Sequence, residues 1–169
     1  MSRKALLLLA ALAGLAGGLV PSCGGKQEVV ETRYPDGQPR VRRAVRLDED
    51  GRPINHGRYA AWHPNGRPEV EGKYREGKRE GRFTYWHANG VKAREGVFRE
   101  GKEEGLWVRW HENGNKADEG EYRGGKREGL WTNFDPGGSI ASRRVYRAGV
   151  PESEQAAGAG GRTPETTRP

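Results

Sequence analysis

The sequence predicts an all-β protein: an extended, single-layer antiparallel meander of β-hairpins with a period of 24 residues. Three observations predict it. A segment that begins at Gly57 returns at Gly81, Gly105 and Gly129. Each copy carries an Asn-Gly or Gly-Gly dipeptide, and most carry a Gly-Lys dipeptide about twelve residues later, both typical of hairpin turns. A strict short period indicates one supersecondary unit stacked in a row.

Residues 1–22 are typical of a secretory signal peptide. Arg3 and Lys4 supply its positive charge, and the apolar run that follows is short for a membrane-spanning helix. The segment ends at Val20-Pro-Ser-Cys23, which resembles a bacterial lipobox. Cys23 is the only cysteine of the chain, and we interpret it as a lipid attachment site. The alternative is an ordinary signal peptide that contains a cysteine. Gly24, by resemblance to enterobacterial sorting, favours the outer membrane.

The rest of the chain divides by composition. Residues 23–29 are expected to be a short tether, and residues 30–150 a repeat array. Residues 151–169 lack an apolar pattern and are expected to be disordered. Within the array we expect a divergent start, three regular repeats and a capping repeat: 30–56, 57–80, 81–104, 105–128 and 129–150.

Turn chemistry gives the expected strand pairing. Asn65-Gly66 and its equivalents suit two-residue type I′ loops, and Gly77-Lys78 and its equivalents suit type II′ loops. With these loops Tyr59 falls opposite Gly72, and we expect every large ring on this face to lie across bare glycine backbone. The repeated structural residues are Gly57, Gly66, Gly72, Gly81, Gly90, Gly96, Gly105, Gly114, Gly120, Gly129, Tyr59, Tyr74, Phe83, Phe98, Trp107, Tyr122 and Trp131. In this register Tyr74 lies between Gly57 and Gly81, Phe98 between Gly81 and Gly105, and Tyr122 between Gly105 and Gly129.

The opposite face is predicted to carry a row of aromatic side chains among charged ones. One interpretation is that these rings pack within the sheet or under its neighbours. The other is a recognition stripe, since exposed tryptophans beside charges suit protein partners and rows of aromatics suit glycans. The candidate binding residues are Trp62, Trp86, Trp110 and Phe134.

The sequence carries no signature of catalysis. Two polar columns recur with the repeat: His63, His87 and His111, and Glu71, Glu95 and Glu119. Equivalent positions two strands apart are separated by about 9.6 Å, too far for three imidazoles to share one zinc ion. The carboxylates lie on an open sheet, where we expect them to pair with neighbouring Arg and Lys. With no nucleophile motif and no phosphate loop, we expect no enzyme activity, no metal and no cofactor.

The pattern G-x-[WYF]-x-x-[WF]-x-x-N-G, followed by G-x-[YF]-x-x-G-K, resembles the MORN-repeat variant of many bacterial proteins, often described as YwqK-like antitoxins. The resemblance covers residues 30–150 and implies an extended antiparallel sheet made of hairpins. The fourth repeat departs from the pattern, with Arg144 in place of Gly and Asp135 in place of His. We interpret that repeat as a cap for the last edge.

Together these features predict a non-catalytic, membrane-anchored binding or scaffold lipoprotein of the bacterial cell envelope, with a protein or an envelope polymer as its partner. The alternative, implied by the resemblance alone, is an immunity or antitoxin protein that neutralises a toxin by protein–protein binding. The formal net charge is +7, and it falls to +5 without Arg3 and Lys4. Interleaved charges of both signs are typical of a solvated surface, with weak attraction to anionic lipid or polymer as the alternative. We expect no nucleic-acid partner.

Overall fold

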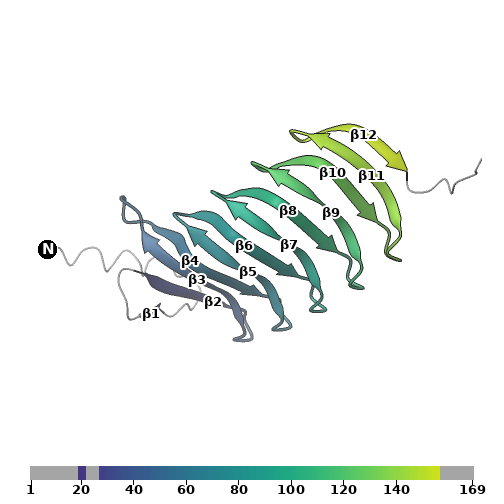
Figure 1. Cartoon of the computed structure of the whole chain (residues 1–169). Coiled ribbons are helices and arrows are strands. Elements are labelled where there is room, and N and C mark those ends of the chain that lie inside the picture. The colour runs from purple at the N-terminus through teal and green to yellow at the C-terminus, as the bar shows by residue number, and fades with distance from the viewer. Residues whose placement is uncertain (1–18, 22–26, 157–169) are drawn as a thin grey trace, which may run out of the picture.

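The computed structural model describes residues 19–21 and 27–156, which form one antiparallel sheet of twelve strands. Each strand pairs with its neighbours in the sequence, so the predicted hairpin meander is confirmed (Figure 1). The strands are β1 (Leu19–Pro21), β2 (Glu28–Arg33), β3 (Pro39–Leu47), β4 (Pro53–Trp62), β5 (Pro68–Arg75), β6 (Lys78–Trp86), β7 (Lys92–Arg99), β8 (Lys102–Trp110), β9 (Lys116–Arg123), β10 (Lys126–Phe134), β11 (Ile140–Arg147) and β12 (Val150–Ala156).

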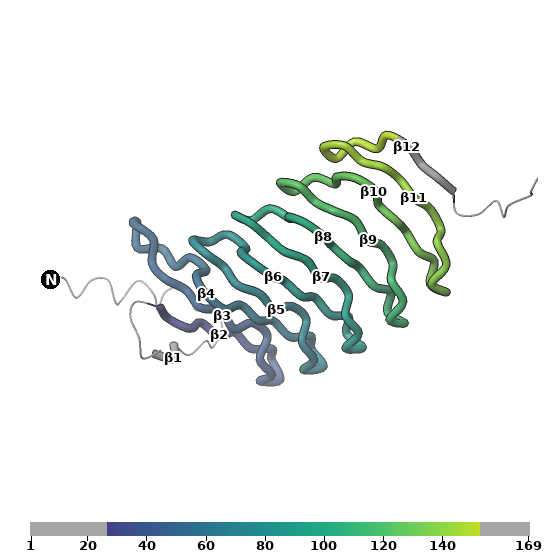
Figure 2. The backbone as a smooth tube through the Cα atoms, in the orientation of Figure 1, coloured from purple at the N-terminus to yellow at the C-terminus, as the bar shows by residue number. Residues whose placement is uncertain are grey.

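The sheet is a long single layer whose turns line two opposite edges. Figure 2 shows the strands side by side from β2 to β12, with one row of turns along each edge. The Asn-Gly turns form one row, which we call the Asn edge. The turns at Glu76-Gly77 and its equivalents form the other, which we call the Glu edge. The described residues contain no apolar helix long enough to cross a membrane.

Both ends of the array differ from the expectation. β2 begins at Glu28, within the predicted tether, and β1 lies within the predicted signal segment, paired with β2. At the other end, β12 pairs with β11, so residues 151–156 are a strand where disorder was expected, and the edge strand is β12 rather than β11. Cys23 and residues 157–169 lie outside the described residues.

The Asn-Gly turns are three-residue loops, and the prediction of two-residue type I′ loops was wrong. In the first regular repeat the N–H of His63 donates to Arg67 O, and the N–H of Gly66 donates to His63 O, both at 2.9 Å. Gly66 alone is left-handed, with φ at 78°. This is a type I turn closed by a glycine bulge. Proline at the first central position, Pro64, fixes the φ that a type I turn requires there.

The predicted position of the turns along the Glu edge was wrong by one residue. Arg75 pairs with Lys78, so the central residues are Glu76 and Gly77, with φ at 51° and 76°. Two positive values define a type I′ turn, whereas type II′ was predicted at Gly77-Lys78. Left-handed backbone is unfavourable for a glutamate. The Gly77 N–H donates to Asn55 O in β4 at 2.8 Å, a contact with the preceding repeat that helps to hold this conformation.

The predicted register is confirmed in the middle of the strands. Tyr59 pairs with Gly72, Phe83 with Gly96, and Trp107 with Gly120. Near the Glu edge it is confirmed on one side of each ring, where Tyr74 pairs with Gly57, Phe98 with Gly81 and Tyr122 with Gly105. It is wrong on the other side, where a bulge shifts the pairing in β6, β8 and β10. Tyr74, Phe98 and Tyr122 therefore pair with Arg79, Glu103 and Arg127, in place of the predicted Gly81, Gly105 and Gly129. Those three glycines have φ between 67° and 75° and no atoms of other residues near where a Cβ would stand.

Rings over glycine do form the core of the sheet, but at one glycine per repeat. A Cβ on Gly72, Gly96 or Gly120 would stand 2.1–2.5 Å from a ring of the next strand. Those rings belong to Phe83, Trp107 and Trp131, each at most 2% exposed. They join Tyr59, Tyr74, Phe98, Tyr122 and Tyr146 in a continuous series of ring contacts with centroids 4.9–6.4 Å apart. We call this side of the sheet the aromatic face.

Three arginines cover the aromatic face in place of a second layer. Arg79 lies 3.9 Å from the centroid of Phe98, Arg94 4.0 Å from Trp107, and Arg127 4.2 Å from Trp131. A guanidinium group stacks on an aromatic ring by cation–π attraction while its edge stays solvated. Burial also raises the pKa of Tyr59 and Tyr74. The aromatic face is therefore closed, which leaves the opposite face as the open side.

Candidate functional site

The open side carries the predicted aromatic row near the Asn edge. We call this side the mixed-charge face. Trp62, Trp86 and Trp110 are half-buried, as is Phe134. Across the hairpin, Trp62 pairs with Pro68, Trp86 with Lys92, Trp110 with Lys116 and Phe134 with Ile140. The row therefore has lysines beside its two central tryptophans and apolar partners at its ends.

Lysine and glutamate side chains fix the surroundings of the central tryptophans. The ammonium group of Lys92 lies 5.2 Å from the ring centroid of Trp110 and 3.0 Å from Glu95 Oε2. Lys116 pairs likewise with Glu119 at 2.7 Å. Partial burial by itself would raise the pKa of Glu95. The hydrogen bonds from Lys92 and Thr84 and the nearby positive charges outweigh this effect, and the pKa of Glu95 is lowered. The predicted pairing of the Glu95 and Glu119 carboxylates with neighbouring cations is confirmed.

Exposed aliphatic side chains continue the apolar surface from the aromatic row towards the centre of the mixed-charge face. Leu106 is 59% exposed, Leu130 52% and Val97 41%. Strand alternation places them on the face opposite the Trp107 and Trp131 rings. Together with the aromatic row they give an open sheet apolar contacts interleaved with charges, which suits recognition of another molecule. These aliphatic residues were not among the predicted binding residues, although their position beside each core ring was a visible signal.

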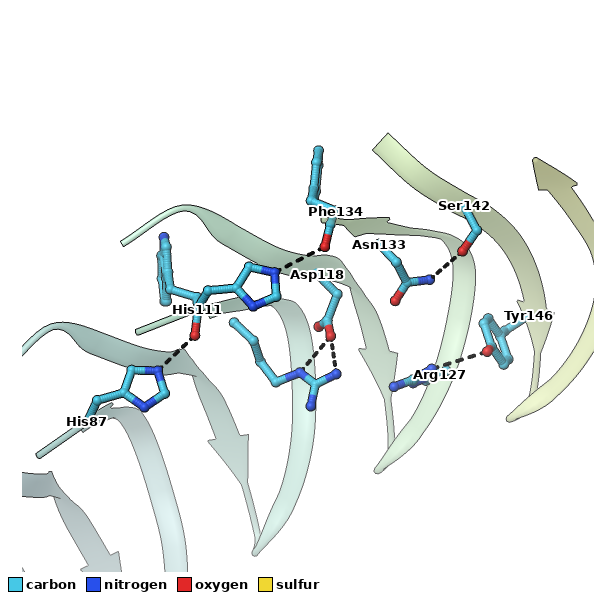
Figure 3. A network of polar contacts seen from close by, with 10 residues as sticks. His87, His111, Asp118, Arg127, Asn133, Phe134, Ser142 and Tyr146 are labelled. Carbon is cyan, nitrogen blue, oxygen red and sulfur yellow. Dashed lines mark hydrogen bonds and ion pairs between the residues drawn. The ribbon is translucent and has the colours of Figure 1, made fainter. Parts of the chain in front are cut away.

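The histidine column has a structural role. The Nε2–H of His63 donates to Trp86 O, that of His87 to Trp110 O, and that of His111 to Phe134 O, at 2.9–3.1 Å. Figure 3 shows the last two of these bonds, each reaching the carbonyl of the following repeat. A carbonyl oxygen only accepts, so the Nε2 atom carries the proton. No group of His, Cys, Asp and Glu within the described residues could hold a metal ion.

The turn asparagines make a second set of links. Asn89 Oδ1 accepts the N–H of Val91 at 2.9 Å, and its Nδ2 donates to Glu112 O at 2.7 Å. Asn65 and Asn113 repeat both contacts. The side-chain amide of each Asn therefore stabilises its own turn and links it to the next one. This structural role accounts for the recurrence of Asn at this position without a role in binding.

The mixed-charge face also contains a shallow hollow over β4, β5 and β6. Its charged lining consists of Arg58, Lys73 and Arg82 with Glu71 and Glu80. Cations and carboxylates alternate across it, and it lies open to solvent. This arrangement offers hydrogen bonds to a polar partner. It gives no enclosed, apolar pocket of the kind that binds small molecules.

The fold and this face define an all-β repeat protein with one closed and one open side. Residues 103–123 match the family model described as MORN repeat variant. This segment is therefore similar to a MORN repeat, and MORN repeats are in general protein- or membrane-binding repeats.

No curated protein matches the sequence. Among solved structures, the chain is similar to a crystal structure of a mutant of S. aureus TarM in complex with fondaparinux, α-GlcNAc-glycerol and UDP. The identity is 10% and the TM-score 0.27, over 85% of this chain and 22% of that one. This chain thus spans about a fifth of that protein's length.

Proposed function

We propose that the protein is a non-catalytic binding or scaffold lipoprotein of the bacterial cell envelope, anchored through Cys23. The observation that carries the binding role is the mixed-charge face. It combines the half-buried Trp86 and Trp110 with exposed Leu106 and Leu130 on a single-layer sheet. Tryptophan supplies a large contact area and dominates the binding energy of many interfaces. The occupant we propose is a protein or an envelope polymer.

The binding role is tested by removing the two central tryptophans. Trp86→Ala with Trp110→Ala should weaken capture of crosslinked envelope partners at least tenfold, measured by quantitative mass spectrometry. The matched variant Trp86→Phe with Trp110→Phe keeps aromatic area and should retain most of the capture. Circular dichroism checks that each variant folds. Unchanged capture by the folded alanine variant would assign these rings a purely structural role.

The anchor is tested separately by metabolic labelling with a palmitate analogue. The wild-type chain should take up the label and fractionate with membranes, whereas Cys23→Ala should do neither. Cys23→Ala should still bind its partner, because the repeat sheet from β2 onward begins after this residue. Equal labelling of both chains would contradict the proposed anchor.

An immunity or antitoxin role is the second candidate, since exposed aliphatic and half-buried Trp side chains suit a protein partner. It requires a toxin that acts in the envelope. Co-production of the chain with a secreted toxin from a neighbouring gene should restore growth, and the alanine variant of the two tryptophans should not. Growth arrest that the wild-type chain fails to relieve would exclude this role for that toxin.

A further inference from the structure

A second surface of the mixed-charge face lies along the Glu edge and is strongly basic. Three successive turns there each place one cation directly opposite another: Arg75 pairs with Lys78, Arg99 with Lys102, and Arg123 with Lys126. All six side chains are exposed. We call these six residues the basic row. Like charges on directly opposite positions of an antiparallel pair are destabilising, and here the arrangement occurs at three successive turns.

Internal carboxylates leave most of this charge uncompensated. Within the part of the chain that the structure describes, the basic row forms one ion pair, between Arg123 and Glu128 at 4.0 Å. The nearby glutamates also have partners outside the row. Glu76 pairs with Arg46 and His56, and Glu80, Glu104 and Glu128 each accept a backbone N–H from the following turn. The carboxylate of Glu100 remains beside the second turn, and the third turn, Gly124-Gly125, carries no acid.

The geometry of the row is linear and periodic. Successive turns of this edge are two strands apart, so the cation pairs repeat about every 9.6 Å. The turns line one long edge of the sheet in a single row (Figure 2). A hollow lined by Arg75, Lys78 and Arg99, together with Glu76, Glu80 and Glu100, lies between the first two steps.

We propose that the basic row binds a linear, phosphate-bearing polymer, which runs along the Glu edge across β5 to β10. Such a chain supplies the missing negative charge at each step and relieves the repulsion between opposed cations. A flat anionic membrane fits less well, because Glu80, Glu104 and Glu121 lie immediately behind the row on the same face and would meet the headgroups. Base recognition is also disfavoured, since the row contains no aromatic side chain on which bases could stack.

This inference does not rest on the proposed function, because the aromatic row lies at the opposite edge. The test is titration of the full-length chain, in neutral detergent, with fluorescently labelled long-chain inorganic polyphosphate. Arg99→Gln, Lys102→Gln, Arg123→Gln and Lys126→Gln combined remove four cations of the basic row. The control combines Arg42→Gln, Arg52→Gln, Arg58→Gln and Arg143→Gln, which removes four exposed cations elsewhere.

The basic-row variant should bind at least tenfold more weakly than wild type, while the control stays within about twofold to threefold. The dependence of affinity on salt should also become shallower, because fewer counterions are released. Trp86→Ala with Trp110→Ala should leave polyphosphate binding unchanged. Equal weakening by the two charge variants would reduce the effect to net charge and overturn the site. Binding to anionic vesicles without binding to polyphosphate would overturn it in favour of a membrane surface.

Discussion

Gly96→Ala is the most direct perturbation of the way this sheet is held together. The new Cβ would stand 2.1 Å from Cδ2 and 2.3 Å from Cε2 of Trp107, whereas ordinary contact begins at 3.4 Å. The indole would have to move by about 1.3 Å, the difference between these distances. It is 1% exposed, lies 4.9 Å from the Phe98 ring, and has Arg94 at 4.0 Å over its face. Little room exists for that movement.

The expected cost follows from these contacts. Overpacking of a well-packed site costs about 1–3 kcal/mol, and a ring held on several sides places Gly96→Ala near the upper end. The φ of Gly96 is not left-handed, so alanine also gains about 0.4–1 kcal/mol through the unfolded chain. The net destabilisation should be about 2 kcal/mol. Urea unfolding followed by circular dichroism measures it.

A double-mutant cycle isolates the clash. Trp107→Ala should cost about 3–5 kcal/mol by itself. In that background Gly96→Ala should be neutral or slightly stabilising, which gives a coupling of about 2 kcal/mol. Two results would refute the reasoning: a Gly96→Ala protein within about 0.5 kcal/mol of wild type, or an equal cost of the substitution with and without the ring.

Three further predictions concern single contacts. Asn89→Ala should lower the free energy of unfolding by about 1–2 kcal/mol in urea titrations, since it removes two hydrogen bonds, and Asn89→Asp should cost less because it keeps the Oδ1 acceptor. Equal destabilisation by the two substitutions would show that the Oδ1 acceptor does not contribute to stability. Trp131→Phe should lower the free energy of unfolding by about 1 kcal/mol more than Trp107→Phe. Trp131 Nε1 donates to Glu121 O at 3.1 Å, whereas Trp107 Nε1 is buried without a partner. The reverse order of stability in thermal unfolding would contradict this. Because the folded-state pKa of Glu95 is lowered, its contribution to stability is present above the pKa of an unfolded glutamate and is lost as pH falls through the folded value. Glu95→Gln should therefore make the acid limb of the stability–pH curve shallower, and an unchanged limb would assign the acid sensitivity to other groups.

Much of the fold was predictable because the repeat encodes it redundantly. Glycines recur with aromatics at fixed spacing, so the pairing of Tyr59 with Gly72 followed from strand alternation and turn spacing alone. The turn types did not follow, because Asn-Gly suits both a type I′ loop and a type I turn with a glycine bulge. The choice depends on contacts with neighbouring repeats, such as the bond from Asn65 Nδ2 to Ala88 O. Those contacts cannot be read from one hairpin.

The candidate site was predictable in part. Strand parity placed the aromatic row among charged side chains on the face opposite the core rings. The sequence also contained a signal for the arginines that cover the aromatic face. Arg94 lies two residues before Gly96 in the same strand, so the two must lie on the same face. That signal was missed because charged residues are ordinarily assigned to solvent. The strand at residues 150–156 was missed for another reason: its sequence has no apolar alternation, and its pairing depends on the free edge of β11.

The histidine links give the array a direction, and with it a rule for growth. Tyr34 donates to Trp62 O in the first hairpin as His63, His87 and His111 do in the later ones, so each unit offers a donor forwards and a carbonyl backwards. In the fourth repeat Asp135 occupies the histidine position, and its carboxylate has no proton to offer onward. A duplicated internal repeat could therefore form this hydrogen bond with both of its neighbours. A unit appended after the fourth would lack that donor, so the histidine link ends at this repeat.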